Sequence, residues 1–291
     1  MSDKNYTHIV MLVDASGSMD KTREATIEGI NKFIESQKVV NTLAPDRNLC
    51  FEDDLSDHSA PHKCTITLCT FSGDGGTRVG TNGETEDAYS YTKINDAQDI
   101  NTVVPLTLAQ YPCYGGTPLI DAYYRTITEC SGFINRLAED DRPGRVIIIS
   151  NTDGEERNSK TYTRKQLKEL IEEKTKLNWQ FIYLGANQEA FSESATYGVQ
   201  AGQALNYQQT PQGIAIGYSY LAANVMDKRL CDTNVMMSCA IGDYDDSKFG
   251  NSAGYATSTT AGRSIGSSKT VKDIIELMED TYPNKTYTTA Y

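Results

Sequence analysis

Short, uninterrupted apolar runs constrain the fold of this chain more than any other feature. Residues 9–13 and 145–150 read IVMLV and RVIIIS, which are continuous and rich in β-branched side chains. A strand with one face in water alternates apolar and polar residues, whereas a continuous run indicates a strand buried on both faces. Strands of this kind occur in parallel sheets that carry helices on both sides.

Strand and helix patterns then alternate along the chain. Further strands are predicted at 64–71, 179–184 and 203–207. Apolar residues at helical spacing predict helices at 19–38, 117–138, 162–176, 187–196 and 210–230. This alternation favours right-handed crossovers between parallel strands. We therefore predict a doubly wound, Rossmann-like α/β domain over residues 7–230, with helices on both faces and ligands at the carboxyl ends of the strands.

The composition excludes several classes of function. The 291 residues contain 27 Lys and Arg against 39 Asp and Glu, a formal net charge of −12. This balance argues against nucleic acid as a partner, because non-specific binding needs clustered basic residues. No apolar run approaches the roughly 18 residues that span a bilayer. The first seven residues lack a secretory signal pattern. We expect no membrane span, a cytoplasmic location and free thiols at the seven cysteines.

Three segments depart from the compact pattern. Residues 41–63 have no usable periodicity and carry a run of acids, which predicts an inserted loop. That loop contains Cys and His residues, but their spacing matches no standard zinc pattern. Residues 231–268 are predicted to be an irregular linker rich in Gly, Ser and Thr, and residues 269–291 a helix and tail. The apolar stripe of the helix at 269–280 is too short to be stable alone, so we expect it to dock on this domain or on another protein.

Oxygen-bearing side chains follow two of the predicted strands and precede a helix. Asp14, Ser16 and Ser18 form a D-x-S-x-S pattern directly after the first strand. Thr117 lies in G-G-T-P before a helix, and Asp153 follows the RVIIIS strand. Hard divalent cations such as Mg²⁺ prefer oxygen ligands. The first motif by itself is also typical of a helix N-cap, and the two further loops favour a metal site.

Taken together, these motifs resemble the von Willebrand factor A domain and its metal-ion-dependent adhesion site. The resemblance covers residues 7–230 and rests on D-x-S-x-S, G-G-T-P and T-D-G in this order. The stretch from 150 to 207 further resembles stand-alone A-domain proteins of bacteria and their phages. The family implies a mostly parallel sheet with one antiparallel edge strand, which we expect within residues 76–94.

The resemblance also implies a role for each site residue. Ser16 and Ser18 would bind the metal through their hydroxyls, and Asp14 would hold metal-bound waters. Thr117 and Asp153 would exchange between direct and water-mediated ligation. The ion would be Mg²⁺, or Mn²⁺ or Ca²⁺, and an Asp or Glu carboxylate of a protein partner would complete its shell. The implied function is a metal-dependent protein-binding module without enzymatic activity.

Two alternatives remain open. The chain could be a structural or assembly component of a phage particle, located in the virion, or of another complex, held by its insert and tail while the metal site only stabilises loops. Enzymatic activity is the least favoured interpretation, because the three histidines accompany no Ser or Cys nucleophile in a motif context. The serines of D-x-S-x-S also do not form the G-x-S-x-G nucleophile elbow.

Overall fold

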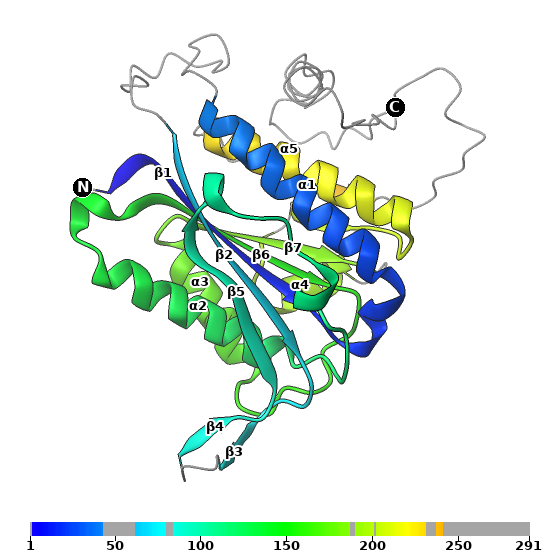
Figure 1. Ribbon diagram of the computed structural model, residues 1–291. Helices are drawn as coiled ribbons and strands as arrows, with labels where there is room; N and C mark the ends of the chain where they lie inside the picture. Colours follow the sequence, from blue (N-terminus) through cyan, green and yellow to red (C-terminus); the bar gives the residue numbers. More distant parts are fainter. Residues whose placement is uncertain are drawn as a thin grey trace.

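The computed structural model describes residues 2–42, 62–79, 84–186, 190–200, 202–230 and 237–240. Most of the predicted insert and linker, and the whole of the predicted C-terminal helix and tail, lie outside the described residues. Figure 1 shows a central sheet with α1 and α5 on one face and α2 and α3 on the other. This arrangement confirms the predicted doubly wound α/β architecture with helices on both faces.

The main sheet has the strand order β5-β2-β1-β6-β7-β8-β9. Its strands are β1 (Asp3–Asp14), β2 (Lys63–Ser72), β5 (Ser90–Asp99), β6 (Pro143–Thr152), β7 (Trp179–Gly185), β8 (Gln203–Asn206) and β9 (Met237–Ala240). Every neighbouring pair is parallel except β2 and β5, which are antiparallel. The first strand begins at Asp3, four residues before the predicted start of the domain.

Each helix lies between two strands of the sheet in the chain, and together the helices cover the sheet. They are α1 (Arg23–Thr42), α2 (Leu119–Arg136), α3 (Arg164–Thr175), α4 (Ala190–Thr196) and α5 (Pro211–Leu230). Short 3₁₀ turns are η1 (Gly17–Thr22), η2 (Ile100–Thr102), η3 (Leu108–Gln110) and η4 (Glu139–Asp141). The first predicted helix, at 19–38, is therefore a 3₁₀ turn followed by α1. The helix predicted at 162–176 is α3, which Thr163 caps through its hydroxyl to the backbone of Gln166.

Strand β1 explains why the apolar runs are continuous. Ile9, Met11 and Val13 pack into the core beneath α1 and α5. Val10 and Leu12 point the other way, into the core beneath α2 and α3. Because successive side chains of a strand alternate between faces, two apolar cores require an apolar residue at every position. Each fully buried aliphatic side chain contributes about 2 kcal/mol to the stability of such a sheet.

The antiparallel edge strand lies later in the chain than predicted. Residues 76–94 were expected to contain it, but β5 covers Ser90–Asp99. The preceding residues form a separate hairpin of β3 (Thr77–Val79) and β4 (Thr85–Asp87), which extends from the body in Figure 1. The strand β5 is polar and half-exposed along most of its length, so it leaves little hydrophobic signal in the sequence. Its pairing with β2 is also interrupted by two register shifts.

The start of α2 also differs from the prediction. The helix predicted from residue 117 begins at Leu119, and its N-cap is Pro118, with no side-chain cap. The Glu156 carboxylate instead accepts a hydrogen bond from the backbone N–H of Ile120 at 2.7 Å. A cap supplied from 36 residues away cannot be recognised in a local sequence pattern. The change leaves the Thr117 side chain available to the loop cluster described below.

Two expectations about the whole chain can be compared with the structure. Cys64, Cys69, Cys113 and Cys130 are free thiols, as predicted, and Cys69 and Cys130 lie in the core. Among the described helices, none is both long and apolar enough to cross a membrane.

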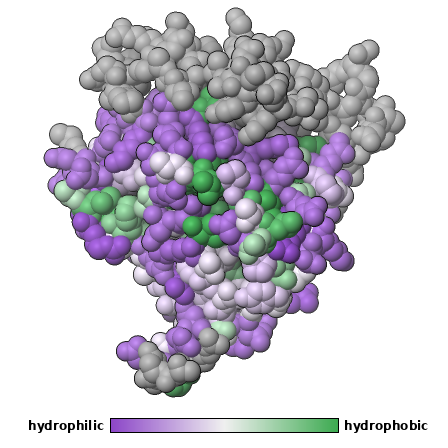
Figure 2. All heavy atoms as spheres, viewed as in Figure 1, coloured by the Kyte–Doolittle hydropathy of each residue, from purple (hydrophilic) through white to green (hydrophobic). Residues whose placement is uncertain are grey.

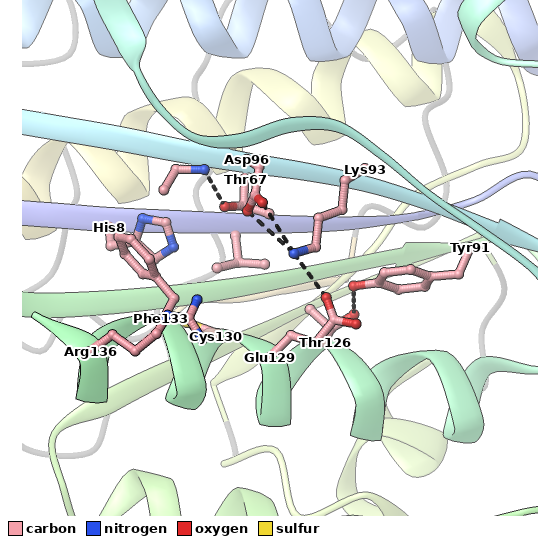
Figure 3. A pocket seen from close by; sticks show the side chains of 12 residues that line it. His8, Thr67, Tyr91, Lys93, Asp96, Thr126, Glu129, Cys130, Phe133 and Arg136 are labelled. Carbon is pink, nitrogen blue, oxygen red and sulfur yellow. Dashed lines mark hydrogen bonds and ion pairs between the residues drawn. The ribbon is translucent and has the colours of Figure 1, made fainter. Parts of the chain in front are cut away.

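A small cavity of about 140 Å³ lies between the edge strand β5 and α2 (Figure 3). The Lys93 amine lies between two carboxylates there, 2.9 Å from Glu129 and 3.3 Å from Asp96. His8 of β1 is fully buried beside it, and its ring lies 5.1 Å from that of Phe133. Burial lowers the pKa of His8 to about 4, and the opposing effect of Asp96 is smaller. His8 is therefore neutral in the folded protein at neutral pH.

We predict that His8 makes folding sensitive to mild acid. The folded-state pKa lies below the unfolded value of 6.5, so only the unfolded chain binds this proton between about pH 6.5 and 4. The free energy of unfolding has its full value with respect to His8 above pH 6.5, and it decreases as the pH falls towards 4. Relative to His8→Gln, the wild type is expected to lose about 3 kcal/mol of unfolding free energy over this range, measured by urea denaturation. Parallel pH profiles of the two proteins would contradict the prediction.

Candidate metal centre

Three loops meet at the carboxyl edge of the central strands. The loop after β1 pairs with the loop before α2, since Gly17 N donates to the Gly115 carbonyl at 3.0 Å and Tyr114 N donates to the Ala15 carbonyl at 2.9 Å. Gly115 has φ +70°, and a Cβ there would lie 2.8 Å from the Cα of Gly73. Only glycine fits this close approach of two backbones without a shift.

The five residues predicted from the sequence lie together at this edge. The hydroxyl oxygens of Ser16 and Ser18 are 3.0 Å apart, and Ser18 donates a hydrogen bond to Asp153 Oδ1 at 2.7 Å. A Cβ on the neighbouring Gly154 would lie 3.2 Å from the Thr117 hydroxyl and 3.7 Å from that of Ser18. The predicted convergence is therefore observed, and metal binding by the cluster stays a prediction.

Asp14 lies behind the two serines and is held on both oxygens. Its Oδ1 accepts from the Ser16 backbone N–H and its Oδ2 from the Thr152 hydroxyl, each at 2.7 Å. The side chain is fully buried. Burial raises the pKa of Asp14 to about 6, against the lowering effect of the Thr152 and Ser16 hydrogen bonds. A carboxylate withdrawn from water in this way is stabilised by a nearby positive charge.

Asp153 is also buried, and its two oxygens have different partners. Ser18 donates to Oδ1, and the amide of Gln209 donates to Oδ2. Burial raises the pKa of this carboxyl, while the Ser18 hydrogen bond and the charge of Lys21 lower it. Ser18 is exposed, so the cluster is open to solvent at Ser18 and closed at Asp14.

The donor set fits a small, hard divalent cation. Ligand oxygens at 2.0–2.1 Å in an octahedron lie about 2.9 Å from their neighbours. The separations of 3.0 Å between Ser16 and Ser18 and 2.7 Å between Ser18 and Asp153 match that spacing. Within the part of the chain that the structure describes, no group of three or more His, Cys, Asp or Glu could hold a metal. A site here would therefore depend on hydroxyl oxygens together with two carboxylates.

Several residues that shape the cluster were not predicted from the sequence. Tyr111 donates its hydroxyl to the Asp14 carbonyl, and Gln209 reaches Asp153 from the loop before α5. Both contacts join residues far apart in the chain, so no local pattern marks them. Thr152 is different, because it precedes Asp153 directly in the T-D-G motif, and its position there could have suggested a role.

A second hydrogen-bond network connects α5 to β6, the strand that ends just before Asp153. The Asn151 side chain accepts from the Tyr207 hydroxyl at 2.8 Å and donates to the Tyr218 hydroxyl at 2.7 Å. All three side chains are buried. Tyr218 packs so closely on α1 that a Cβ on Gly29 would lie 2.4 Å from its ring. The position of α5 is therefore fixed relative to the end of β6, just before the loop that carries Asp153.

The loop after β6 is held by carboxylate and amide side chains. Asn158 accepts from the backbone N–H of Thr117 at 3.0 Å and donates to Asp74 at 3.1 Å. The buried carboxylate of Asp121 accepts hydrogen bonds from four backbone N–H groups, those of Gly76, Lys160, Thr161 and Tyr162. Asp121 thereby joins α2 to the loops that follow β2 and β6, and keeps Thr117 in place.

The strand order, with its one antiparallel edge strand, and the three loops at the carboxyl edge now decide the architecture. The chain has the fold of a von Willebrand factor A domain. No protein-family model matches the sequence. No curated protein matches it either. The resemblance to proteins of bacteria and their phages stays a prediction.

Three solved structures illustrate what this chain is similar to. Proximal thread matrix protein 1 from the mussel byssus is 13% identical with a TM-score of 0.45, covering 78% of this chain and 47% of its own. The pilus adhesin SpaC from Lactobacillus rhamnosus GG is 11% identical with a TM-score of 0.45, and the match covers 76% of this chain and 30% of SpaC. The SpRpn10 VWA domain is 12% identical with a TM-score of 0.38, and the match covers 73% of this chain and 93% of that domain.

These likenesses are distant. The chain spans less than half the length of the byssus protein structures that it matches. One of these structures is described as having a zinc-occupied MIDAS motif. Scores this low do not by themselves establish a shared fold, so the assignment rests on the strand order and loops of this chain.

We predict that Asp121 supports the whole cluster. Replacing it by Ala leaves four backbone N–H groups without their acceptor, and the free energy of unfolding is expected to fall by about 3 kcal/mol. Chemical denaturation of the purified protein measures the change. The exposed Glu169 of α3 provides the control, since Glu169→Gln removes a carboxylate from the surface. Equal stability of the Asp121 and Glu169 variants would contradict this role.

Proposed function

We propose that this protein is a metal-dependent protein-binding module. A divalent cation, Mg²⁺ or Mn²⁺, binds at Asp14, Ser16, Ser18, Thr117 and Asp153 and captures an Asp or Glu carboxylate of a partner protein. The observation that carries the proposal is the hydroxyl-rich cluster, in which Ser16 and Ser18 lie 3.0 Å apart beside two buried carboxylates.

The chain's own groups determine how strongly such an ion attracts a carboxylate. When bound, the cation supplies a Lewis-acidic position for an incoming oxygen. Ser16 and Ser18 are neutral ligands, so they leave most of its charge uncompensated. Asp14 is held away by Thr152 and by the Ser16 backbone, and it contributes its charge from behind. The hydrogen bonds that Asp153 accepts from Ser18 and Gln209 reduce the charge it can donate.

The surface beside the cluster suits a protein partner. Figure 2 shows that the face seen in Figure 1 is mostly hydrophilic, with hydrophobic side chains gathered near its middle. The later part of the segment between β5 and α2, which leads to the cluster, carries two large exposed side chains, Leu108 and Tyr114. Tyr114 directly precedes Gly115 and Gly116 in the loop that carries Thr117, and it is 49% exposed. Tyrosine buries apolar area while keeping a polar end, which favours contact with a protein surface.

The groups at the cluster also favour binding over catalysis. The Ser18 hydroxyl donates directly to Asp153, without the imidazole that activates a serine nucleophile. His8 lies elsewhere, on the α2 side of the sheet, where its Nδ1 is hydrogen-bonded to the Thr65 hydroxyl at 2.8 Å. We therefore propose that the protein has no enzymatic activity at this site.

We predict that the full-length protein binds Mn²⁺ or Mg²⁺ through the hydroxyl cluster. In isothermal titration calorimetry, the double variant Asp14→Ala with Ser16→Ala is expected to lose at least about ten-fold in affinity, because it removes a direct ligand and the charge behind it. Circular dichroism verifies that the variant folds. The matched control is Ser219→Ala, which removes an exposed hydroxyl of α5. Absence of metal binding by the wild type would overturn the proposed function.

We predict that partner capture needs both the metal and a partner carboxylate. Proteins that co-purify with the chain in Mg²⁺ are expected to be lost in EDTA and from the Asp14 and Ser16 double variant. Mass spectrometry of the two eluates identifies the partner, and replacing its acidic residues by Asn or Gln locates the carboxylate. A partner retained equally in EDTA would instead support the alternative that the metal only stabilises the loops of an assembly component.

A further inference from the structure

The cavity between β5 and α2 has a buried end and an open end (Figure 3). At the buried end, His8 is 1% exposed and Cys130 is 7% exposed. At the open end, the side chain of Asp96 is 65% exposed, and Arg136 is exposed as well. The volume of about 140 Å³ is close to the roughly 150 Å³ of a protein cavity that binds benzene. The cavity is therefore large enough for a molecule with a ring-sized body.

The cavity lies where β5 departs from regular strand geometry. The pairing of β5 with β2 shifts register twice between residues 66 and 69 of β2, and Ala97 has φ +46°. The Ala97 backbone N–H donates to the Thr67 hydroxyl at 2.9 Å. Successive side chains of a regular strand point to opposite faces, but the adjacent Asp96 and Ala97 both line this cavity. Irregularities of this kind re-aim side chains and are common beside binding sites.

One hydrogen-bonding atom at the buried end has no partner. His8 Nδ1 lies 2.8 Å from the Thr65 hydroxyl. Among the described residues, none hydrogen-bonds to the other ring nitrogen, Nε2. A buried polar group without a partner costs free energy, so Nε2 favours a hydrogen-bonding group inside the cavity. Because Nε2 donates in one neutral tautomer and accepts in the other, a hydroxyl group, which does both, satisfies either tautomer.

The two carboxylates that line the cavity already have cationic partners. The Lys93 amine lies 2.9 Å from Glu129 and 3.3 Å from Asp96. Glu129 also accepts a hydrogen bond from Arg125 at 2.7 Å. These ion pairs compensate the negative charge on the cavity wall, so it does not exclude an anionic ligand.

Arg136 is the charged lining residue that has no such partner. Within the described part of the chain, no carboxylate pairs with it. A Cβ on Gly132 would lie 3.5 Å from Arg136 Nη1, so the guanidinium lies back along α2, on the wall of the cavity. A guanidinium binds a carboxylate through two parallel hydrogen bonds. The ring of Phe133, 5.1 Å from that of His8, supplies an apolar wall.

We propose that this cavity binds a small organic acid that carries a hydroxyl group. The carboxylate pairs with Arg136 at the open end, and a ring-sized apolar body contacts Phe133. The hydroxyl bonds to His8 Nε2 at the buried end. The site uses none of the five residues of the candidate metal centre, so it is independent of the proposed metal-dependent function.

The experiment compares three probes that differ by one group. They are para-hydroxybenzoate, benzoate, which lacks the hydroxyl, and para-hydroxybenzamide, which lacks the charge. Their affinities for the full-length chain are measured by NMR titration in EDTA, so that a metal contributes nothing. The chain has three histidines, so the imidazole nitrogen spectrum is simple, and the His8 signal is identified by its loss in His8→Phe.

The wild type is expected to bind para-hydroxybenzoate about ten-fold more tightly than either of the other probes. Arg136→Gln removes the preference over the amide and keeps the preference over benzoate, and His8→Phe does the reverse. The matched control is Lys165→Gln, which removes a cation that is 84% exposed on α3 and keeps both preferences. Circular dichroism verifies each fold. If His8→Phe does not fold, a shift of the wild-type His8 signal by para-hydroxybenzoate but not by benzoate tests the same contact.

Three results overturn the proposal. The first is that para-hydroxybenzoate shows no saturable binding. The second is that benzoate or the amide binds as tightly as para-hydroxybenzoate. The third is that a preference survives in the variant that lacks the side chain assigned to it. In each case the cavity is a water-filled gap beside an irregular edge strand.

Discussion

Burial of the central strands on both faces is the constraint on which the rest of the molecule depends. Strands β1 and β6 lie between two cores, so their central residues, 9–13 and 146–149, are all apolar. Oxygen-bearing side chains gather where the strands end, and both strands end at the same edge because they are parallel. The loops that carry Asp14 and Asp153 are thereby brought to one place. The candidate site is thus a consequence of how the core is covered.

Buried charges in this domain are accommodated in three different ways. Asp121 is fully paired by backbone N–H groups and serves as a structural centre for three segments. Asp14 is partly paired, and burial raises its pKa, which makes a positive charge beside it favourable. Among the described residues, the buried Lys228 amine finds no hydrogen-bond partner. The degree of pairing separates a structural role from a binding role, since a fully paired group has no remaining demand for a ligand.

Much of the fold follows from the sequence because strong signals mark the central elements. The runs at 9–13 and 145–150 predict β1 and β6, and the helical spacings predict the five helices to within a few residues. The edge strand β5 was placed too early, since its polar side chains carry no periodic signal and the hairpin before it shares its composition. The start of α2 was misjudged for a related reason, because Glu156 caps it from another loop. Errors of both kinds arise where tertiary contacts replace local preference.

The sequence by itself determined the order of the central strands and helices, the edge at which polar loops gather and the five oxygen-bearing residues of the cluster. These depend on residue type and on position at the end of a strand or the start of a helix. Only the tertiary structure decided which groups surround them. The contacts of Gln209 with Asp153 and of Tyr111 with Asp14 join segments 56 and 97 residues apart. The same is true of Lys228, whose burial depends on how α5 lies across the sheet. Pairings between distant segments leave no local pattern, since any polar residue in a loop could make them.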